Sequence, residues 1–448
     1  MSTATASPTQ LKRQLGLWSA TALVVGEVIA VGIFLTPAQM SKSIGSPLWI
    51  AAVWLGVGAM SLCGALCYGE LAARFPEAGG GYVYLREAYG PRLAFLYGWK
   101  SFLVMDPGLT AALGIGLASY AGYIVRLSPV GAKAVALAVI WALALANIVG
   151  IRVGAALLRW LTFLKLGLLA VIILWAIVGG LGDWNNLLPL AAQREGSSGL
   201  LGALAGGMVA AFFSFGGWWD LSKLAGEVRE PEKNLPRALA LGVAAVTAVY
   251  LLTSLVFLYL VPFERVTSGE TFAAQAGDVL FGQAGGRVFS AIVIVSVLGS
   301  LAAVIMSAPR VYYAMARDHL FLPGAAAVHP RFATPARAIA LQAAMASVLV
   351  ALGTFDQIIA YFIFVTVAFI ALTVVAVFVL RRRGGPSAYA MPGYPAVPIV
   401  FLILIAALLV MVAAGKPKES LFGVAVVALG LPVYQLLFKG GRRTHDVD

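Results

Sequence analysis

The sequence predicts an all-α membrane protein with twelve transmembrane helices. Hydrophobic residues make up 61% of the 448 positions and charged residues only 11%, whereas a soluble domain carries about 25% charged residues. Apolar stretches of about 20 residues, the length that crosses a bilayer, recur from Leu17 almost to the C-terminus with short polar breaks between them. This pattern predicts one membrane domain instead of several soluble ones.

The polar breaks define the predicted spans in order. Residues 1–16 and 439–448 are predicted to be tails, because the first ten residues are rich in Ser, Thr and Ala and have little apolar surface to bury. Residues 17–383 hold ten core helices, and residues 384–438 add two peripheral ones. The twelve spans cover residues 17–41, 47–73, 91–125, 131–150, 155–180, 199–226, 236–262, 284–316, 335–353, 356–380, 396–414 and 420–438.

The distribution of basic residues predicts the orientation. An even number of spans places both termini on one side of the membrane, and most of the 31 lysines and arginines then fall in segments on that side. Since basic loops stay in the cytoplasm, we expect a multi-pass protein of the plasma (inner) membrane with both termini cytoplasmic. We interpret the tract Arg381–Arg383 as an anchor at the end of a span, the alternative being a lipid-binding patch.

The first and sixth spans each contain a point at which the helix is predicted to break. Glycine and polar residues interrupt the apolar run at Gly26–Phe34 and again at Phe212–Asp220, and glycine is about 1 kcal/mol less favourable than alanine inside a helix. The two positions correspond if residues 17–180 and 199–383 form a 5+5 inverted repeat, and such a pair indicates a site at the membrane midplane. Alternatively, the glycines only allow close helix packing.

A broken helix exposes backbone groups that suit a zwitterion. The amides near Val31, Gly32 and Ile33 are expected to bind a carboxylate, and the carbonyls near Val28, Phe213 and Gly216 an ammonium group. The sequence therefore predicts a site for a zwitterion such as an amino acid. Its predicted residues are Val28, Ile29, Ala30, Val31, Gly32, Ile33, Phe213, Ser214, Phe215, Gly216 and Gly217.

The motifs around these breaks resemble those of the amino acid–polyamine–organocation superfamily, and most closely the L-type amino acid transporters and their bacterial homologues. The resemblance extends from about Leu11 beyond the tenth span. The matching motifs are Gly26–Phe34 in the first span, Pro76 with Gly79–Tyr82 and Tyr84–Leu85, Phe213–Trp218 in the sixth span, Gly226–Val228 with Pro231 and Lys233–Pro236, Ala314–Asp318, and Gly393–Pro395.

The resemblance implies the leucine-transporter fold, with broken helices 1 and 6. It also implies secondary active transport of L-amino acids across the plasma membrane by alternating access, as sodium-independent exchange; the alternatives are proton-coupled symport and antiport of cationic amino acids or polyamines. Two positions depart from the family pattern. Ala30-Val31-Gly32 stands where the family has Gly-Ser-Gly, and Glu27 stands where it usually has Asn.

Three charged residues within the spans are candidates for coupling or for replacing an ion. A carboxylate inside a membrane helix costs about 2.5 kcal/mol or more, so Glu27 is expected either to bind a cation, to carry a proton, or to pair with Lys165. In relatives with a lysine at this point of the fifth helix the ammonium is thought to replace sodium; otherwise Lys165 reaches the membrane surface. Asp106 either lines the substrate path or pairs with Lys100. We interpret Asp220 and Lys223 as a structural pair.

The remaining features exclude other classes of protein. No metal-binding or nucleophile motif lies on the spans, so we expect no enzymatic activity, no metal and no cofactor. The net charge of +12 is scattered among the breaks, which argues against nucleic acid. The expected partners are the amino acid substrate and the lipid bilayer. Eukaryotic L-type relatives attach to a heavy chain through a cysteine between helices 3 and 4, but residues 126–133 contain none, so no heavy-chain subunit is expected.

Overall fold

Helices form nearly all the regular structure of the chain. The computed structural model describes residues 11–194, 196–265, 272–352, 355–384 and 388–438, in which a single bridge between Leu15 and Val228 is the only β pairing. The α-helices are α1 (Leu17–Val28), α2 (Gly32–Ile44), α3 (Pro47–Arg74), α4 (Gly81–Tyr89), α5 (Pro91–Lys100), α6 (Asp106–Ile124), α7 (Pro129–Val149), α8 (Ile151–Val178), α9 (Leu200–Ser214), α10 (Pro231–Leu260), α11 (Phe272–Phe281), α12 (Gly285–Ser307), α13 (Pro309–Arg317), α14 (Ala336–Leu352), α15 (Phe355–Arg382), α16 (Ala396–Gly415), α17 (Pro417–Ala428) and α18 (Gly430–Leu437).

Shorter helical turns connect these elements. A π-helical turn, η1 (Ser101–Met105), joins α5 to α6. The 3-10 helices are η2 (Trp184–Leu187), η3 (Trp218–Glu227), η4 (Phe263–Arg265), η5 (Gly282–Ala284) and η6 (Pro323–Ala326).

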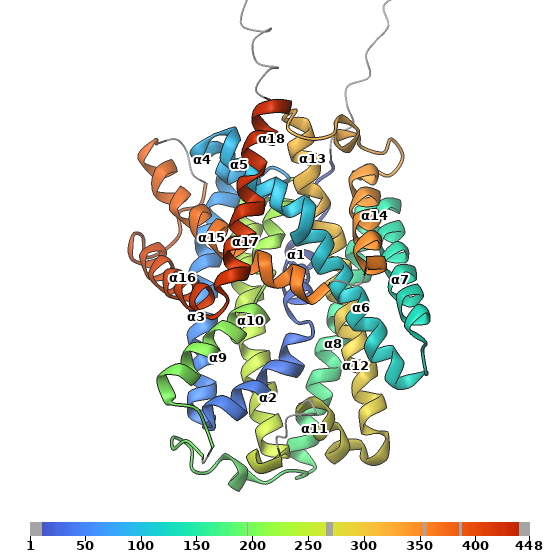
Figure 1. Cartoon of the computed structure of the whole chain (residues 1–448), viewed down its shortest axis with the longest axis vertical. Coiled ribbons are helices and arrows are strands. Elements are labelled where there is room, and N and C mark those ends of the chain that lie inside the picture. The colour runs from blue at the N-terminus through green and yellow to red at the C-terminus, as the bar shows by residue number, and fades with distance from the viewer. Residues whose placement is uncertain (1–10, 195, 266–271, 353–354, 385–387, 439–448) are drawn as a thin grey trace, which may run out of the picture.

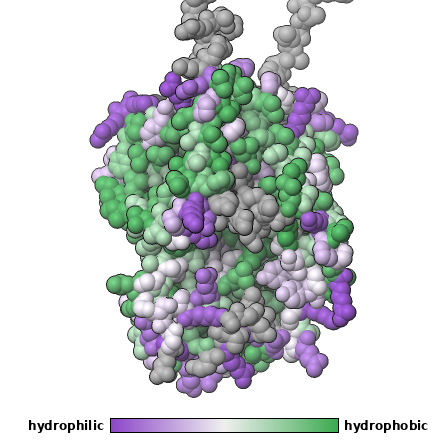
Figure 2. All heavy atoms as spheres, in the orientation of Figure 1, coloured by the Kyte–Doolittle hydropathy of each residue, from purple (hydrophilic) through white to green (hydrophobic). Residues whose placement is uncertain are grey.

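The prediction of an all-α membrane protein is confirmed. Within the described ranges, ten helices are long and apolar enough to cross a membrane, and the bent pair α1 and α2 makes an eleventh span. Helix α14, where the ninth span was predicted, has 17 residues and falls short of that length. Twelve spans and the inverted repeat therefore stay predictions. Figure 2 shows hydrophobic side chains over much of one face, which is the surface that a lipid environment requires.

The two predicted tails lie mostly outside the described residues, namely residues 1–10 and 439–448. The described part of the N-terminal tail is hydrogen-bonded to the rest of the protein. The backbone amides of Gln14 and Leu15 both donate to the Glu227 carbonyl at 2.8 and 2.9 Å, and the Arg229 amide donates to the Leu15 carbonyl at 2.8 Å. These bonds fasten the chain before α1 to the end of η3.

Helix α1 lies at the centre of the fold (Figure 1), where it packs against α8, α10, α12 and η3. Seven successive residues of α1, from Ala22 to Val28, are buried, including Glu27. A helix that is buried on all sides needs apolar residues on all its faces, which explains its lack of an amphipathic pattern. By contrast, α16 packs at the periphery against α3 and α15, and α17 packs against α15 and α5.

Both predicted helix breaks are present. Helix α1 ends at Val28, α2 begins at Gly32, and their axes differ by 46°. Helix α9 ends at Ser214, and η3 begins at Trp218 after a turn in which Gly217 has a φ of 110°. A Cβ atom on Gly217 would lie 2.8 Å from Cγ of Glu27, so both the backbone conformation and the close packing against α1 require glycine.

Candidate functional site

A cavity of about 480 Å³ lies between the two breaks, within the usual size range of small-molecule sites. Most of the predicted site residues line it, and it also takes in parts of α5, α6, α12 and α15. The predicted residues that line it are Val28, Ala30, Val31, Gly32, Phe213, Ser214, Gly216 and Gly217.

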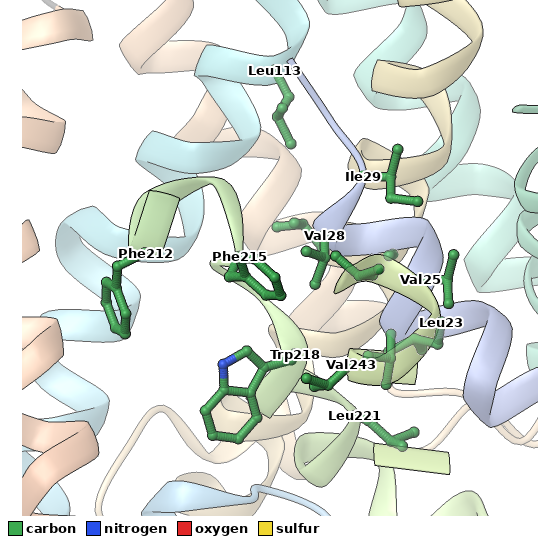
Figure 3. Packing of buried hydrophobic residues seen from close by; sticks show 14 of the residues in the cluster. Leu23, Val25, Val28, Ile29, Leu113, Phe212, Phe215, Trp218, Leu221 and Val243 are labelled. Atoms are coloured by element: carbon green, nitrogen blue, oxygen red, sulfur yellow. The ribbon is translucent and has the colours of Figure 1, made fainter. Parts of the chain in front are cut away.

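Three predicted site residues do not line this cavity. Ile29 and Ile33 are fully buried in the apolar core, and the ring of Phe215 packs 5.2 Å from that of Tyr250 and 6.2 Å from that of Trp54. Figure 3 shows Phe215 and Val28 facing one another, with Ile29 on the other side of the chain. Successive residues of an unwound segment point in different directions, so only some of them reach the cavity.

The first turn of α2 offers free backbone donors. The amides of Val31, Gly32 and Ile33 donate to no acceptor in the part of the chain that the structure describes. Because the first amides of a helix have no intrahelical acceptor and carry the positive end of its dipole, they form a binding site for an anionic group such as a carboxylate.

The carbonyls expected to hold an ammonium group are partly engaged. The Tyr250 hydroxyl lies 2.8 Å from the Val28 carbonyl and 2.7 Å from the Ser214 carbonyl, and the Gly216 amide donates to the Phe213 carbonyl at 3.0 Å. A hydroxyl has one hydrogen and a carbonyl has two lone pairs. The Val28 carbonyl also accepts from the Ala30 amide at 2.9 Å, so it keeps a free lone pair when Tyr250 donates to Ser214. The Gly216 carbonyl accepts no bond from any described residue.

Two side-chain contacts connect the breaks directly. Besides Tyr250, which joins Val28 of α1 to Ser214 of α9, the hydroxyls of Thr36 and Ser214 lie 2.7 Å apart. Sequence reasoning missed Tyr250; its only signal is a phenol in the middle of the apolar seventh span, where a hydroxyl needs a partner.

We predict that Tyr250→Phe destabilises the protein by about 1 to 3 kcal/mol, because it leaves a buried carbonyl without its donor while keeping the ring. Thermal denaturation of the purified protein measures this. Tyr259→Phe is the matched control, since its hydroxyl makes no hydrogen bond among the described residues. Equal melting temperatures for both variants would contradict the assigned role.

Lys165 contacts the backbone of the first helix break and is fully buried, so its side chain does not reach the membrane surface. Its ammonium donates to the carbonyls of Gly26, Ile29 and Ser296 at 2.8, 2.6 and 2.9 Å. The Ser300 hydroxyl lies 2.9 Å from the same Gly26 carbonyl. A ring of carbonyls around one positive charge is the kind of site that also binds a metal cation.

The ion-pair partner of Asp106 is not the one that the sequence suggested. Asp106 lines the cavity, but it pairs with Lys223 at 3.2 Å and not with Lys100. Lys223 also pairs with Asp220 at 2.9 Å, as predicted. Lys100 instead donates to the Thr366 hydroxyl at 3.3 Å.

Glu27 does not form the predicted alternative pair with Lys165. Its side chain lines the cavity against Gly217, and neither carboxyl oxygen has a hydrogen-bond partner among the described residues. An unpartnered buried carboxyl group costs free energy. Glu27 is therefore the group most ready to accept a proton or a cation from the cavity.

The substrate cavity adjoins another cavity. It shares Gln39, Ala210, Phe213 and Ile363 with a second cavity of about 590 Å³ that extends to Lys416 at the end of α16. At the end of η3, a fully buried ion pair joins Arg310 to Glu227 at 2.8 Å, beside the bonds that hold Gln14 and Leu15 to the Glu227 carbonyl.

Comparisons with known proteins place the chain in a family. The family model described as amino acid permease matches residues 15–431. The serine/threonine exchanger SteT of Bacillus subtilis (strain 168) is 33% identical over 433 residues, 95% of this chain and 96% of that protein. The b(0,+)-type amino acid transporter 1 of Homo sapiens is 28% identical, covering 96% and 88% of the two chains. The Asc-type amino acid transporter 1 of Mus musculus is 27% identical, covering 95% and 81%.

Proposed function

The chain belongs to the amino acid permease family and is a membrane transporter of amino acids, and on this premise we propose that it is a sodium-independent exchanger of L-amino acids that works by alternating access. The α-carboxylate binds the free amides of Val31, Gly32 and Ile33. The α-ammonium binds the carbonyls near Val28 and Gly216. The observation that carries this proposal is the set of unpaired backbone groups of both signs around one cavity.

Sodium independence rests on Lys165. Its ammonium already donates to three carbonyls around the first break, and a sodium ion at the same place would meet an uncompensated like charge. The exchange mode rests on the similarity to the bacterial relative, a serine/threonine exchanger. The hydroxyl pair of Thr36 and Ser214 beside the cavity is suited to a small substrate with a polar side chain.

Glu27 favours a second candidate function. An unpartnered carboxyl group on the cavity wall fits proton-coupled symport, because it has a place to hold a proton. It also fits antiport of cationic amino acids or polyamines, because a second ammonium group of the substrate would pair with it.

We further propose that the protein lies in the plasma membrane with both termini in the cytoplasm, and that it functions without a heavy-chain subunit. The link between α6 and α7 contains no cysteine for a disulfide to such a partner. Purification from cells under non-reducing conditions tests this: a single band is expected, and a disulfide-linked second chain would contradict it.

Uptake into proteoliposomes distinguishes the candidates. Radiolabelled amino acids are presented to wild type and Glu27→Gln, with and without internal amino acid, sodium and a pH gradient. We expect uptake to require internal amino acid, to be equal with and without sodium, and not to depend on the pH gradient. Uptake that the gradient alone drives, and that Glu27→Gln abolishes, would instead establish proton symport.

A further inference from the structure

A third cavity, which is positively charged, lies away from the substrate cavity, beside the first turn of α1. Its volume is about 420 Å³. Three arginines line it: Arg152 and Arg159 from α8, and Arg229 from the segment after η3. The small residues Ala155 and Ala156 leave space between the two arginines of α8, and the remaining wall is the chain from Gln14 to Ser19.

These arginines have no anionic partner in the described part of the chain. No side-chain hydrogen bond or ion pair is found for Arg152, Arg159 or Arg229 within the described residues, and no carboxylate lines the cavity. The nearest acidic residues in sequence are already paired, Glu227 with Arg310 and Glu230 with Lys233. The cavity therefore gathers three exposed positive charges that no described carboxylate neutralises, which suits an anionic ligand.

The backbone adds donors to the same cavity. Gly16, Leu17, Trp18 and Ser19 line it and form the start of α1, a helix of 12 residues whose N-cap, Gly16, provides no side-chain hydrogen bond. The first amides of a helix favour an anion through their free N–H groups and the helix dipole. Together with the guanidinium groups they suit phosphate, to which arginine donates two parallel hydrogen bonds.

The position of the cavity favours a lipid as the source of that phosphate. Arg152 and Arg159 are seven residues apart on α8, and Arg159 lies about 12 Å along the helix from Ile151. Trp18 and Trp160 are 67% and 64% exposed beside them, and exposed tryptophans concentrate at the level of lipid headgroups. Guanidinium groups at this depth on the outer surface of a membrane helix face headgroups.

We propose that this cavity binds the phosphate headgroup of an anionic phospholipid. The lipid phosphate accepts hydrogen bonds from the three arginines and from the first amides of α1, and its acyl chains lie along α8. The site is also joined to the N-terminal segment, because the Arg229 amide donates to the Leu15 carbonyl. A bound lipid would therefore stabilise the bonds between the N-terminal segment and η3.

Native mass spectrometry of the purified full-length protein tests the proposal. Phosphatidylglycerol, phosphatidylcholine and inorganic phosphate are titrated separately onto wild type and onto the triple variant Arg152→Gln/Arg159→Gln/Arg229→Gln. We expect wild type to bind phosphatidylglycerol about tenfold or more tightly than phosphatidylcholine, since each basic residue near a membrane surface contributes about 1 kcal/mol to binding an anionic lipid. The triple variant should lose this preference.

A control of equal charge separates the site from general surface charge. Arg92→Gln/Arg337→Gln/Arg382→Gln removes three exposed arginines that lie outside the cavity and should retain the preference. If the first variant does not fold, Arg159→Gln alone should still weaken phosphatidylglycerol binding severalfold. Equal lipid binding by wild type and the folded variants would overturn the proposal, and so would tight binding of inorganic phosphate without a preference between the lipids.

Discussion

Lys165→Ala is expected to abolish amino acid uptake and to destabilise the protein by about 3 kcal/mol or more. The substitution removes the donor to three buried carbonyls, those of Gly26, Ile29 and Ser296, and hydrogen bonds to charged groups contribute about 1.5 to 3 kcal/mol each. The Gly26 and Ile29 carbonyls belong to the unwound end of α1. Without Lys165 only the Ser300 hydroxyl remains, among the described residues, as a side-chain donor to these two carbonyls, so we expect the first break to shift and the amides of α2 to move away from the cavity.

The effect of sodium on the stability of Lys165→Ala shows whether the lysine occupies a cation site or only stabilises the fold. If the ammonium occupies a cation site, the space left by Lys165→Ala contains carbonyls and the Ser300 hydroxyl, which are ligands that a hard cation accepts. Sodium should then restore part of the thermal stability of the variant and leave wild type unchanged. Lys42→Ala, at an exposed lysine, is the control. Wild-type uptake by Lys165→Ala without sodium would contradict the assignment.

Gly32→Ala is expected to reduce transport by about 100-fold, the cost of a displacement of about 1 Å in a reactive or binding geometry. A Cβ at Gly32 would lie 2.8 Å from Oγ, 2.9 Å from Cβ and 3.0 Å from Cα of Ser214. Because one of these atoms belongs to the backbone, a side-chain rotation does not relieve the contact, and the two breaks must separate.

A double variant tests this explanation of Gly32→Ala. Ser214→Gly removes two of the three close contacts, so Gly32→Ala/Ser214→Gly should transport better than Gly32→Ala alone. Gly167→Ala on α8 is the control, because a Cβ there would meet no atom within 4 Å. Uptake measured at several substrate concentrations should show the loss. Unchanged uptake by Gly32→Ala would show that the breaks are further apart in the working protein.

The positions of the helix breaks were predictable because glycine and polar residues interrupt long apolar spans at Gly26–Phe34 and Phe212–Asp220, and both breaks are observed. The directions of individual side chains were not predictable. Ile29, Ile33 and Phe215 have the same apolar character as their neighbours, yet they face the core, since the orientation of an irregular segment depends on what packs around it.

The ion pair of Asp106 shows a second limit. Lys100 precedes Asp106 by six residues, which places the two side chains on different faces of a regular helix, and the π-helical turn Ser101–Met105 lies between them. The actual partner, Lys223, comes from η3 and is 117 residues away in the sequence. Contacts of this kind depend on the tertiary fold, and a single sequence contains no periodic signal for them.

The most direct test of the central claim is an experimental structure of the protein with a transported amino acid bound. We predict the α-carboxylate within about 3 Å of the amides of Val31, Gly32 and Ile33, and the α-ammonium beside the carbonyls of Val28 and Gly216. An amino acid bound outside the cavity between the two breaks, or one whose ammonium group faces the first turn of α2, would contradict the account.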